Sequence, residues 1–208
     1  MQLNNSIQIK TEVIIENVVA TAGINQEINI KKIIKKFPEA KYDPKKFPGA
    51  IIKLKSPRAT ILLFRTGSIV CTGTKSEESA KDALSFFADK LEESGIDLVH
   101  GLSEVKIENI TSSCNLKNKI QLENAARMLP RSLYEPEQFP GIIHRMLYPK
   151  TVILLFASGK LVCTGAKVTS DVYLSVNTLR SMLEEKHLMN ENKENIQMEH
   201  HNLINLKE

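Results

Sequence analysis

Amide and aromatic side chains recur at the same spacing in the two halves of this 208-residue sequence. Asn17 and Phe64 have identical residues 92 positions later, at Asn109 and Phe156. An amide donates and accepts hydrogen bonds without changing its charge, and an aromatic ring packs against flat apolar surfaces. This set of side chains favours recognition of another molecule over catalysis.

An enzyme is the first alternative class. The sequence has no phosphate-cradling glycine-rich loop, no His-Glu-x-x-His and no Gly-x-Ser-x-Gly motif, and its five histidines do not repeat between the halves. Cys71 and Cys163 do repeat, but strand alternation places them opposite the threonines that follow, where we expect packing rather than nucleophilic work. We predict no enzymatic activity, no cofactor and no metal site, and we interpret His200 and His201 as a solvated pair.

Four motifs repeat without a gap and predict a duplicated domain. We expect residues 1–10 to be a short leader, residues 11–100 and 101–187 to be the two repeats, and residues 188–208 to be a flexible tail. The paired motifs are Val13–Asn17 with Val105–Asn109, Tyr42–Gly49 with Tyr134–Gly141, Ile61–Phe64 with Ile153–Phe156, and Val70–Gly73 with Val162–Gly165.

The elements that position these motifs are predicted from periodicity, caps and turns. Each half should be an α+β unit of strand, short helix, three strands and long helix. Ser76 is the expected N-cap of the first long helix, and Gly95 should end it. The first half should contain strands at 13–21, 48–54, 60–64 and 69–72 and a short helix at 26–37; the second long helix should span 170–185.

Strand alternation divides the side chains between two faces of the predicted sheet. Val70 and Thr72 share one face, and Ile69 and Cys71 share the other. If helices cover the second face, the first is apolar, carries Asn and Thr and lacks charge, which marks an interaction site. The sequence alone leaves open which face is free.

Charge distribution is more informative than net charge. The chain has a formal net charge of +4, but residues 31–75 hold 12 basic and 2 acidic residues. Such clustering is typical of a polyanion-binding surface, although a solvated lysine-rich face is the simpler alternative. The chain has no apolar run long enough for a membrane span, no signal peptide is expected, and three cysteines indicate reduced thiols.

Over residues 11–186 the sequence resembles the TATA-box-binding proteins. The resemblance rests on Glu-Asn at 16–17 and 108–109, Tyr-x-Pro-x-x-Phe at 42–47 and 134–139, Leu-Phe-x-x-Gly at 63–67 and 155–159, and Val-Cys-Thr-Gly-x-Lys at 70–75 and 162–167. The paired Phe-Pro-Gly and Val-Cys-Thr-Gly sequences are similar to archaeal members. The resemblance implies a saddle whose curved antiparallel sheet binds DNA on its concave face, with helices on the convex face.

The resemblance also assigns residues to the DNA minor groove. There, A·T and T·A pairs present only acceptors and G·C adds an amino donor, so an apolar face with amide donors suits A·T-rich DNA. Four phenylalanines match the wedges that unstack base steps and kink the duplex, although a lone Phe in a strand is usually core. The groove set is Asn17, Val19, Leu62, Val70, Thr72, Asn109, Thr111, Leu154, Val162 and Thr164; the wedges are Phe47, Phe64, Phe139 and Phe156.

Basic residues that match phosphate contacts should supply salt-dependent affinity rather than sequence choice. Ser68 departs from this pattern, since the equivalent residue of the second repeat, Lys160, is basic. At another pair of equivalent positions, Val19 of the first repeat is replaced by Thr111 in the second, so the groove floor is not symmetric. The matching residues are Lys53, Arg58, Lys75, Arg145, Lys150, Lys160 and Lys167.

The second Tyr-x-Pro-x-x-Phe loop is implied to dock the B-type transcription initiation factor. Glu135 and Glu137 match the acidic patch, and Gln138 departs from a position that is frequently apolar in the family. Loop carboxylates that only aid solubility are the alternative. RNA polymerase would then be recruited indirectly, through the B-type factor. Without DNA, two copies of the chain could form a homodimer through their groove faces. The expected place is the cytoplasm or nucleoid of an archaeon, or the nucleus of a eukaryote. A protein-binding scaffold that has lost DNA binding is the second alternative.

Overall fold

The computed structural model describes residues 12–190, whose contacts form two compact units. The first-repeat unit contains residues 15–111 and 165–169, and the second-repeat unit contains residues 12–14, 112–164 and 170–190. These units differ from the predicted repeats of residues 11–100 and 101–187, because the strand at 106–115 is divided between them.

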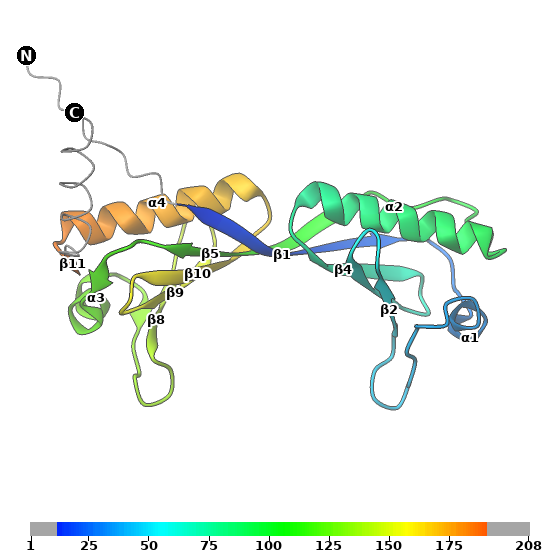
Figure 1. The fold of residues 1–208 in the computed structure, drawn as a ribbon, viewed down its shortest axis with the longest axis horizontal. Coiled ribbons are helices and arrows are strands. Elements are labelled where there is room, and N and C mark those ends of the chain that lie inside the picture. Colours follow the sequence, from blue (N-terminus) through cyan, green and yellow to red (C-terminus); the bar gives the residue numbers. More distant parts are fainter. Residues whose placement is uncertain (1–11, 191–208) are drawn as a thin grey trace, which may run out of the picture. The chain divides into compact units, whose positions relative to one another are not determined.

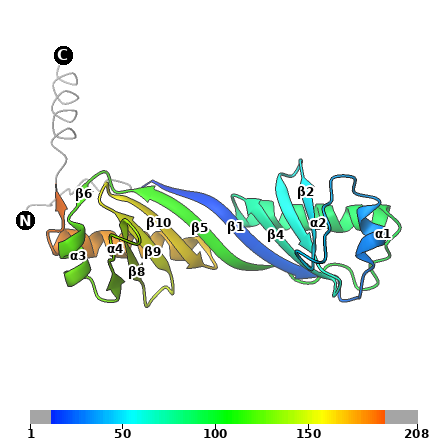
Figure 2. The same cartoon turned by 90° about the horizontal axis from the view of Figure 1, so that it is seen from below.

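An antiparallel sheet in the order β2-β3-β4-β1 forms the first-repeat unit. Helix α2 lies along one face of this sheet, whereas the opposite face faces the viewer in Figure 2 (Figures 1 and 2). The elements are β1 (Val13–Gly23), α1 (Ile30–Ile34), β2 (Ala50–Leu54), β3 (Ala59–Leu63), β4 (Ser68–Thr74) and α2 (Glu77–Glu93).

The sequence signals for α2 are confirmed. Ser76 is its N-cap and accepts a hydrogen bond from the backbone N–H of Ser79 at 3.0 Å, and two glutamates occupy the positive end of the helix dipole. The apolar stripe is buried as its spacing predicts, with Phe87 and Leu91 fully inaccessible. Burial of a side chain of this size contributes about 1.5–3 kcal/mol, so tertiary packing fixes this helix against the sheet.

The short helix predicted over residues 26–37 is wrong in extent, because α1 spans only five residues. The preceding segment is extended instead: the N–H of Ile28 donates to the carbonyl of Arg65 at 2.9 Å, and that of Ile24 to Gly67 at 3.1 Å. Asn29 then caps α1 by accepting from Lys32. Backbone pairing to the β3–β4 turn therefore outweighs the helical periodicity of the isoleucines.

The second-repeat unit repeats this design with the strand order β5-β10-β9-β8-β7. In the same unit, β11 and β6 form a separate pair. The elements are β5 (Lys106–Asn115), β6 (Lys119–Ile120), α3 (Leu122–Met128), β7 (Ser132–Leu133), β8 (Gly141–Arg145), β9 (Val152–Phe156), β10 (Lys160–Ala166), α4 (Thr169–Glu185) and β11 (Met189–Asn190).

The interior of the second-repeat unit is more polar than its counterpart. Thr151 Oγ1 and Ser175 Oγ lie 2.8 Å apart, where the first repeat has the buried Ala59 and Ala83. Buried His144 lies 3.0 Å from Ser132 through Nδ1, where the first repeat has Ile52. These groups are hydrogen-bonded, as burial of polar atoms requires.

The predicted tail boundary at residue 188 is too early. Leu188 is buried, and Met189–Asn190 forms β11, which pairs with β6. The rest of the predicted tail, including His200 and His201, and the predicted leader lie outside the described residues.

Candidate nucleic-acid interface

Helix packing decides which sheet face is free in each repeat. In β4, Ile69 and Cys71 are inaccessible beneath α2, whereas Val70 and Thr72 on the other face remain half-buried. In β10, buried Cys163 alternates in the same way with half-buried side chains. The helices therefore cover the cysteine face, and the threonine face stays accessible.

All ten predicted groove residues lie on strand positions that are neither fully buried nor fully exposed. Within the first-repeat unit these are Asn17, Val19, Leu62, Val70, Thr72, Asn109 and Thr111. Within the second-repeat unit they are Leu154, Val162 and Thr164. Within each unit, therefore, the side chains form an apolar surface with amide and hydroxyl groups among them.

A β-bulge fixes the orientation of the Asn17 amide. Val18 pairs with Thr74 and Ala20 with Cys71, so Thr72 and Gly73 lie opposite a single residue of β1. Gly73 adopts φ +87°, and its N–H donates to Asn17 Oδ1 at 2.8 Å. Thr72 Oγ1 donates to the same oxygen at 3.2 Å. Because a backbone N–H can only donate, Oδ1 must face the bulge, which leaves Nδ2 as the outward group.

The second asparagine is held by the equivalent bond. Gly165 adopts φ +97°, and its N–H donates to Asn109 Oδ1 at 2.8 Å. Asn109 Nδ2 donates to Thr111 Oγ1 at 3.2 Å, a contact for which Val19 gives Asn17 no counterpart. Both amides thus turn their oxygens toward a glycine N–H, and the second amide is held on its nitrogen side too.

A glycine lets the first pair of phenylalanines pack on the backbone. The Phe47 and Phe64 ring centroids lie 5.7 Å apart at an interplanar angle of 61°. A Cβ on Gly49 would lie 2.9 Å from Phe47 Cε1 and 3.0 Å from Phe64 Cε1. The Phe-Pro-Gly sequence therefore supplies both a ring and the space that the rings need.

The second pair of phenylalanines is arranged in the same way. Phe139 and Phe156 are 5.6 Å apart at 59°, and all four rings are half-buried. A Cβ on Gly141 would lie 3.0 Å from Phe139 Cε1 and 2.9 Å from the Leu155 carbonyl oxygen. Each repeat therefore presents two phenylalanine rings packed against each other, at the boundary between interior and solvent.

All seven predicted phosphate-binding residues are exposed. Two of them form ion pairs at equivalent positions of the repeats: Lys75 with Glu16 at 3.4 Å and Lys167 with Glu108 at 3.0 Å. The hydrogen bond from Lys167 lowers the pKa of Glu108, and one from Thr21 adds to this effect. No sequence pattern indicates these ion pairs, although the Glu-Asn motif supplies both glutamates.

The predicted partner-binding residues lie on an exposed loop. Glu135, Glu137 and Gln138 are accessible, and the Glu135 carbonyl accepts from the N–H groups of Gln138 and Phe139 at 2.9 Å. This turn directs the side chains of the loop into solvent.

A cavity that no sequence pattern predicts lies beside the second pair of rings. Its volume is about 580 Å³, and Phe156, Val162 and Lys160 line it together with Ile14 and Cys114. Ile14 is 48% exposed, so this apolar wall is open to solvent. The four glycines at 49, 73, 141 and 165 were also missed as site residues; their places within repeated motifs were the available signal.

Burial accounts for the chemistry of the thiols. It raises the pKa of Cys71 and of Cys114 to about 11, and it also raises the pKa of Cys163. Thiolate is the reactive form, so these buried thiols behave as small apolar side chains.

Between residues 12 and 190, no three His, Cys, Asp or Glu side chains are grouped as a metal site would require. In the same range, no helix has the length and apolarity that crossing a membrane demands.

Comparison with known proteins identifies the family. The model of the family described as "Transcription factor TFIID (or TATA-binding protein, TBP)" matches residues 12–94 and again residues 104–186. The TATA-box-binding protein of Pyrobaculum calidifontis is 46% identical over 171 residues, covering 82% of this chain and 85% of the relative. That of Methanosphaera stadtmanae is 39% identical over 180 residues, covering 86% and 98%.

A solved structure agrees with the sequence relatives. The Methanococcus jannaschii TBP superposes with a TM-score of 0.76 at 36% sequence identity, covering 84% of this chain and 99% of that one. The double match follows the internal repeat, and the relatives named above are archaeal, as the paired motifs indicated. The chain belongs to the TATA-binding protein family, in its archaeal form.

Proposed function

We propose that the protein is a general transcription initiation factor that binds A·T-rich promoter DNA in the minor groove and kinks it. Relatives named as TATA-box-binding proteins support the general role. The observation that carries the groove assignment is the orientation of Asn17 and Asn109 by glycine N–H groups, on the face that the helices leave accessible.

Groove chemistry explains why this orientation favours A·T pairs. Adenine N3 and thymine O2 are acceptors in the minor groove, whereas guanine adds an amino donor. An outward Nδ2 can donate to A·T or T·A, but it would oppose the guanine amino group. Apolar side chains on the same sheet face, such as Val70 and Leu62, offer that amino group no acceptor.

The paired rings of each repeat act as wedges between bases of the bound site. An apolar wedge unstacks a base step at a cost of a few kcal/mol. This cost is the general one for minor-groove proteins that insert wedges, a group to which the TATA-binding proteins belong. The bent duplex offsets that cost by contacting more protein surface. Phe47 with Phe64, and Phe139 with Phe156, are each packed as a pair, which fixes the direction of the rings before DNA arrives.

Exposed cations hold the phosphate backbone. Exposed basic side chains lie on strands β2, β8 and β10 and on the β2–β3 and β8–β9 turns: Lys53, Arg145, Lys160, Arg58 and Lys150. Lys75 and Lys167 exchange their glutamate partners for phosphates when DNA binds. Each phosphate that is neutralised makes affinity more salt-dependent.

The acidic loop of the second repeat docks the B-type initiation factor, which then brings RNA polymerase. The argument is charge: Glu135 and Glu137 are exposed here, whereas the first-repeat loop has Lys45 and Lys46. Opposite charges on otherwise equivalent loops direct a basic partner to the second repeat.

A salt titration with an A·T-rich duplex tests the proposal against a scaffold that has lost DNA binding. A fluorescently labelled duplex should bind tightly at low salt and weaken steeply as salt rises, and a G·C-substituted centre should bind less well. Little affinity at any salt would contradict the proposed function. A footprint that protects the major groove would contradict the minor-groove assignment.

A further inference from the structure

We propose that a lysine-rich surface on the first repeat binds DNA that continues beyond the wedge of Phe47, so that the protein grips one flank of its site. This inference rests on the proposed DNA binding and assigns a second contact surface to the same ligand. The flank surface is defined by four lysines of the α1 region and two of the wedge loop: Lys31, Lys32, Lys35, Lys36, Lys45 and Lys46.

The lysines of the flank surface are exposed, and most of their positive charge is not neutralised by nearby acidic residues. All six lysines are exposed, and none of the four in the α1 region forms an ion pair with another residue in the 12–190 range. Residues 30–36 contain no acidic residue, and the inward side chains of α1 are Ile30 and Ile33.

The neighbouring acids are already engaged. Glu27 pairs with Arg65 at 3.3 Å, and Glu39 pairs with Lys55 at 2.6 Å. Asp43 approaches Lys46 at 3.7 Å, with both side chains largely exposed. The local carboxylates therefore neutralise other cations or pair loosely, and the flank surface keeps its positive charge.

The second repeat provides an internal comparison. The six equivalent positions, 92 residues later, carry Glu123, Asn124, Arg127, Met128, Glu137 and Gln138. Six positive charges are thus replaced by one positive and two negative charges on an equivalent short helix and wedge loop. The repeat fold forms without lysines at these positions, as the second repeat shows. We therefore attribute the positive charge to a function that only the first repeat has.

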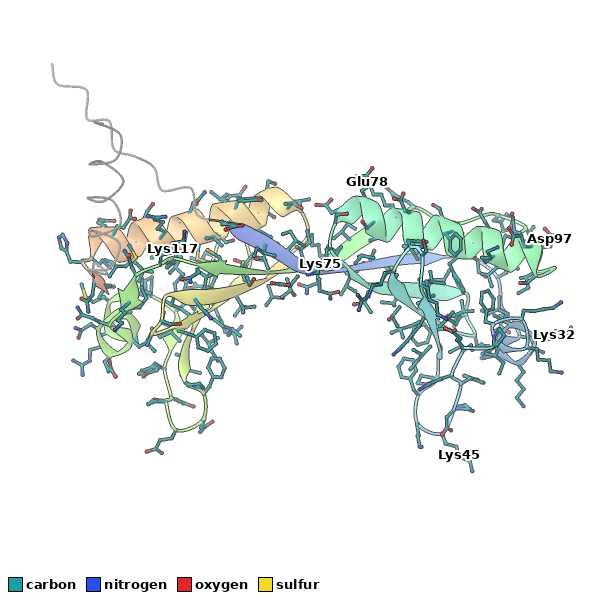
Figure 3. All side chains as sticks on the ribbon, viewed as in Figure 1. Lys32, Lys45, Lys75, Glu78, Asp97 and Lys117 are labelled. Carbon is teal, nitrogen blue, oxygen red and sulfur yellow. The ribbon has the colours of Figure 1, made fainter. Side chains whose placement is uncertain are left out.

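Position favours DNA as the ligand. Lys46 directly precedes Phe47, and the base of the loop is tied to β2 by the bridge between Lys41 and Ile51. Lys45 lies at the tip of the loop and Lys32 on the outer side of α1, both on the first-repeat unit (Figure 3). A duplex presents one negative charge per about 1.7 Å of axis, which suits a surface of successive lysines.

Duplex length is the variable that tests this inference. Binding of the full chain is measured by fluorescence anisotropy over a salt series, with one duplex that contains only the A·T-rich box and one extended on both sides. The extended duplex should bind more tightly. Its slope of log affinity against log salt should be steeper by about 2 to 4, since each added phosphate contact contributes about 0.9.

Paired substitutions locate the effect. K32Q/K36Q and K45Q/K46Q should each lose most of the gain from extension. The control K81Q/K119Q also removes two exposed lysines, on α2 and β6, and should keep the gain. A hydroxyl-radical footprint should extend beyond the box at one end only, and the extension should disappear in K32Q/K36Q.

Three results would overturn the inference. Equal affinity and slope for the short and long duplexes would show that flanking DNA is not bound. If K32Q/K36Q and the control K81Q/K119Q lost the same share of the affinity gained from duplex extension, the effect would be one of general charge only. Binding of a poly-glutamate peptide to the α1 lysines, with flank length without effect, would assign the surface to an acidic protein. In each case, binding to the short duplex would still report on the proposed function separately.

Discussion

The N–H of Gly73 and the side-chain oxygen of Asn17 are joined by a 2.8 Å hydrogen bond that originates in a β-bulge. Gly165 and Asn109 repeat this bond at the same length. Both glycines adopt positive φ, a conformation that side-chain-bearing residues rarely take. The bulge thus converts an amide with two possible orientations into one whose donor points outward.

Asn17→Asp tests whether the donor is what the groove requires. The carboxylate has nearly the same shape and still accepts from Gly73, but it presents an acceptor to the acceptors of A·T pairs. We expect a loss of about 1–3 kcal/mol of discrimination, or about 5- to 150-fold weaker binding to the A·T-rich duplex. Anisotropy measures the change, with Asn177→Asp on the exposed face of α4 as the charge-matched control. Unaltered affinity in Asn17→Asp would exclude a donor role.

Phe139→Ala or Phe156→Ala should reduce the bend of the DNA as well as the affinity. Removal of either ring leaves its partner without the contact at 5.6 Å, and it removes stacking worth about 1–3 kcal/mol. Fluorescence transfer between the ends of a labelled duplex measures the bend. Phe86→Leu on α2 is a half-buried aromatic control that should keep the bend. An unchanged bend in both wedge variants would count against the wedge role.

The two Phe-Pro-Gly glycines should respond differently to alanine. In Gly49→Ala the three atoms nearest to the new Cβ belong to the phenylalanine rings, which can move, so the wedge should shift and the bend decrease with little loss of stability. In Gly141→Ala it meets the Leu155 carbonyl at 2.9 Å, and a backbone atom yields less readily. We expect Gly141→Ala to cost about 1–3 kcal/mol, seen as a lower Tm by calorimetry. Equal Tm values for both variants would contradict this distinction.

Glu137→Arg should block recruitment of the B-type factor and leave DNA binding intact. The side chain is exposed on the acidic loop, so the change reverses charge without disturbing packing. A gel-shift assay distinguishes the protein–DNA complex from the ternary complex. Glu92→Arg, on exposed α2 surface, is the control for charge reversal. Normal ternary-complex formation by Glu137→Arg would refute the docking assignment.

His144 should make folding stability depend on pH. Burial lowers its pKa below the ordinary 6.5, and a hydrogen bond to the Pro130 backbone opposes only part of that shift. The unfolded chain therefore binds the proton more readily, and stability is lost as pH falls below about 6.5 toward the folded pKa. Urea midpoints at pH 8 and pH 5 measure the loss. His144→Ile, which copies Ile52, should reduce it; an equal pH dependence in this variant would assign the effect to other groups.

The sequence by itself determined the duplication, the strands and the long helices. The spacing of Ala80, Leu84, Phe87 and Leu91 and the cap at Ser76 set α2, because these signals are local and are satisfied by one face of one helix. It also determined which side chains share a strand face, because a strand has a period of two.

Only the tertiary structure decided which face is free and how the site residues are oriented. Alternation groups Val70 with Thr72, but the packing of α2 on Cys71 is what leaves them accessible. Three features depend on residues that are between 37 and 59 positions apart in the sequence. They are the extent of α1, the hydrogen bond from Gly73 to Asn17, and the ion pair of Lys75 with Glu16. No local pattern encodes such contacts, since they exist only after the chain has brought separate strands side by side.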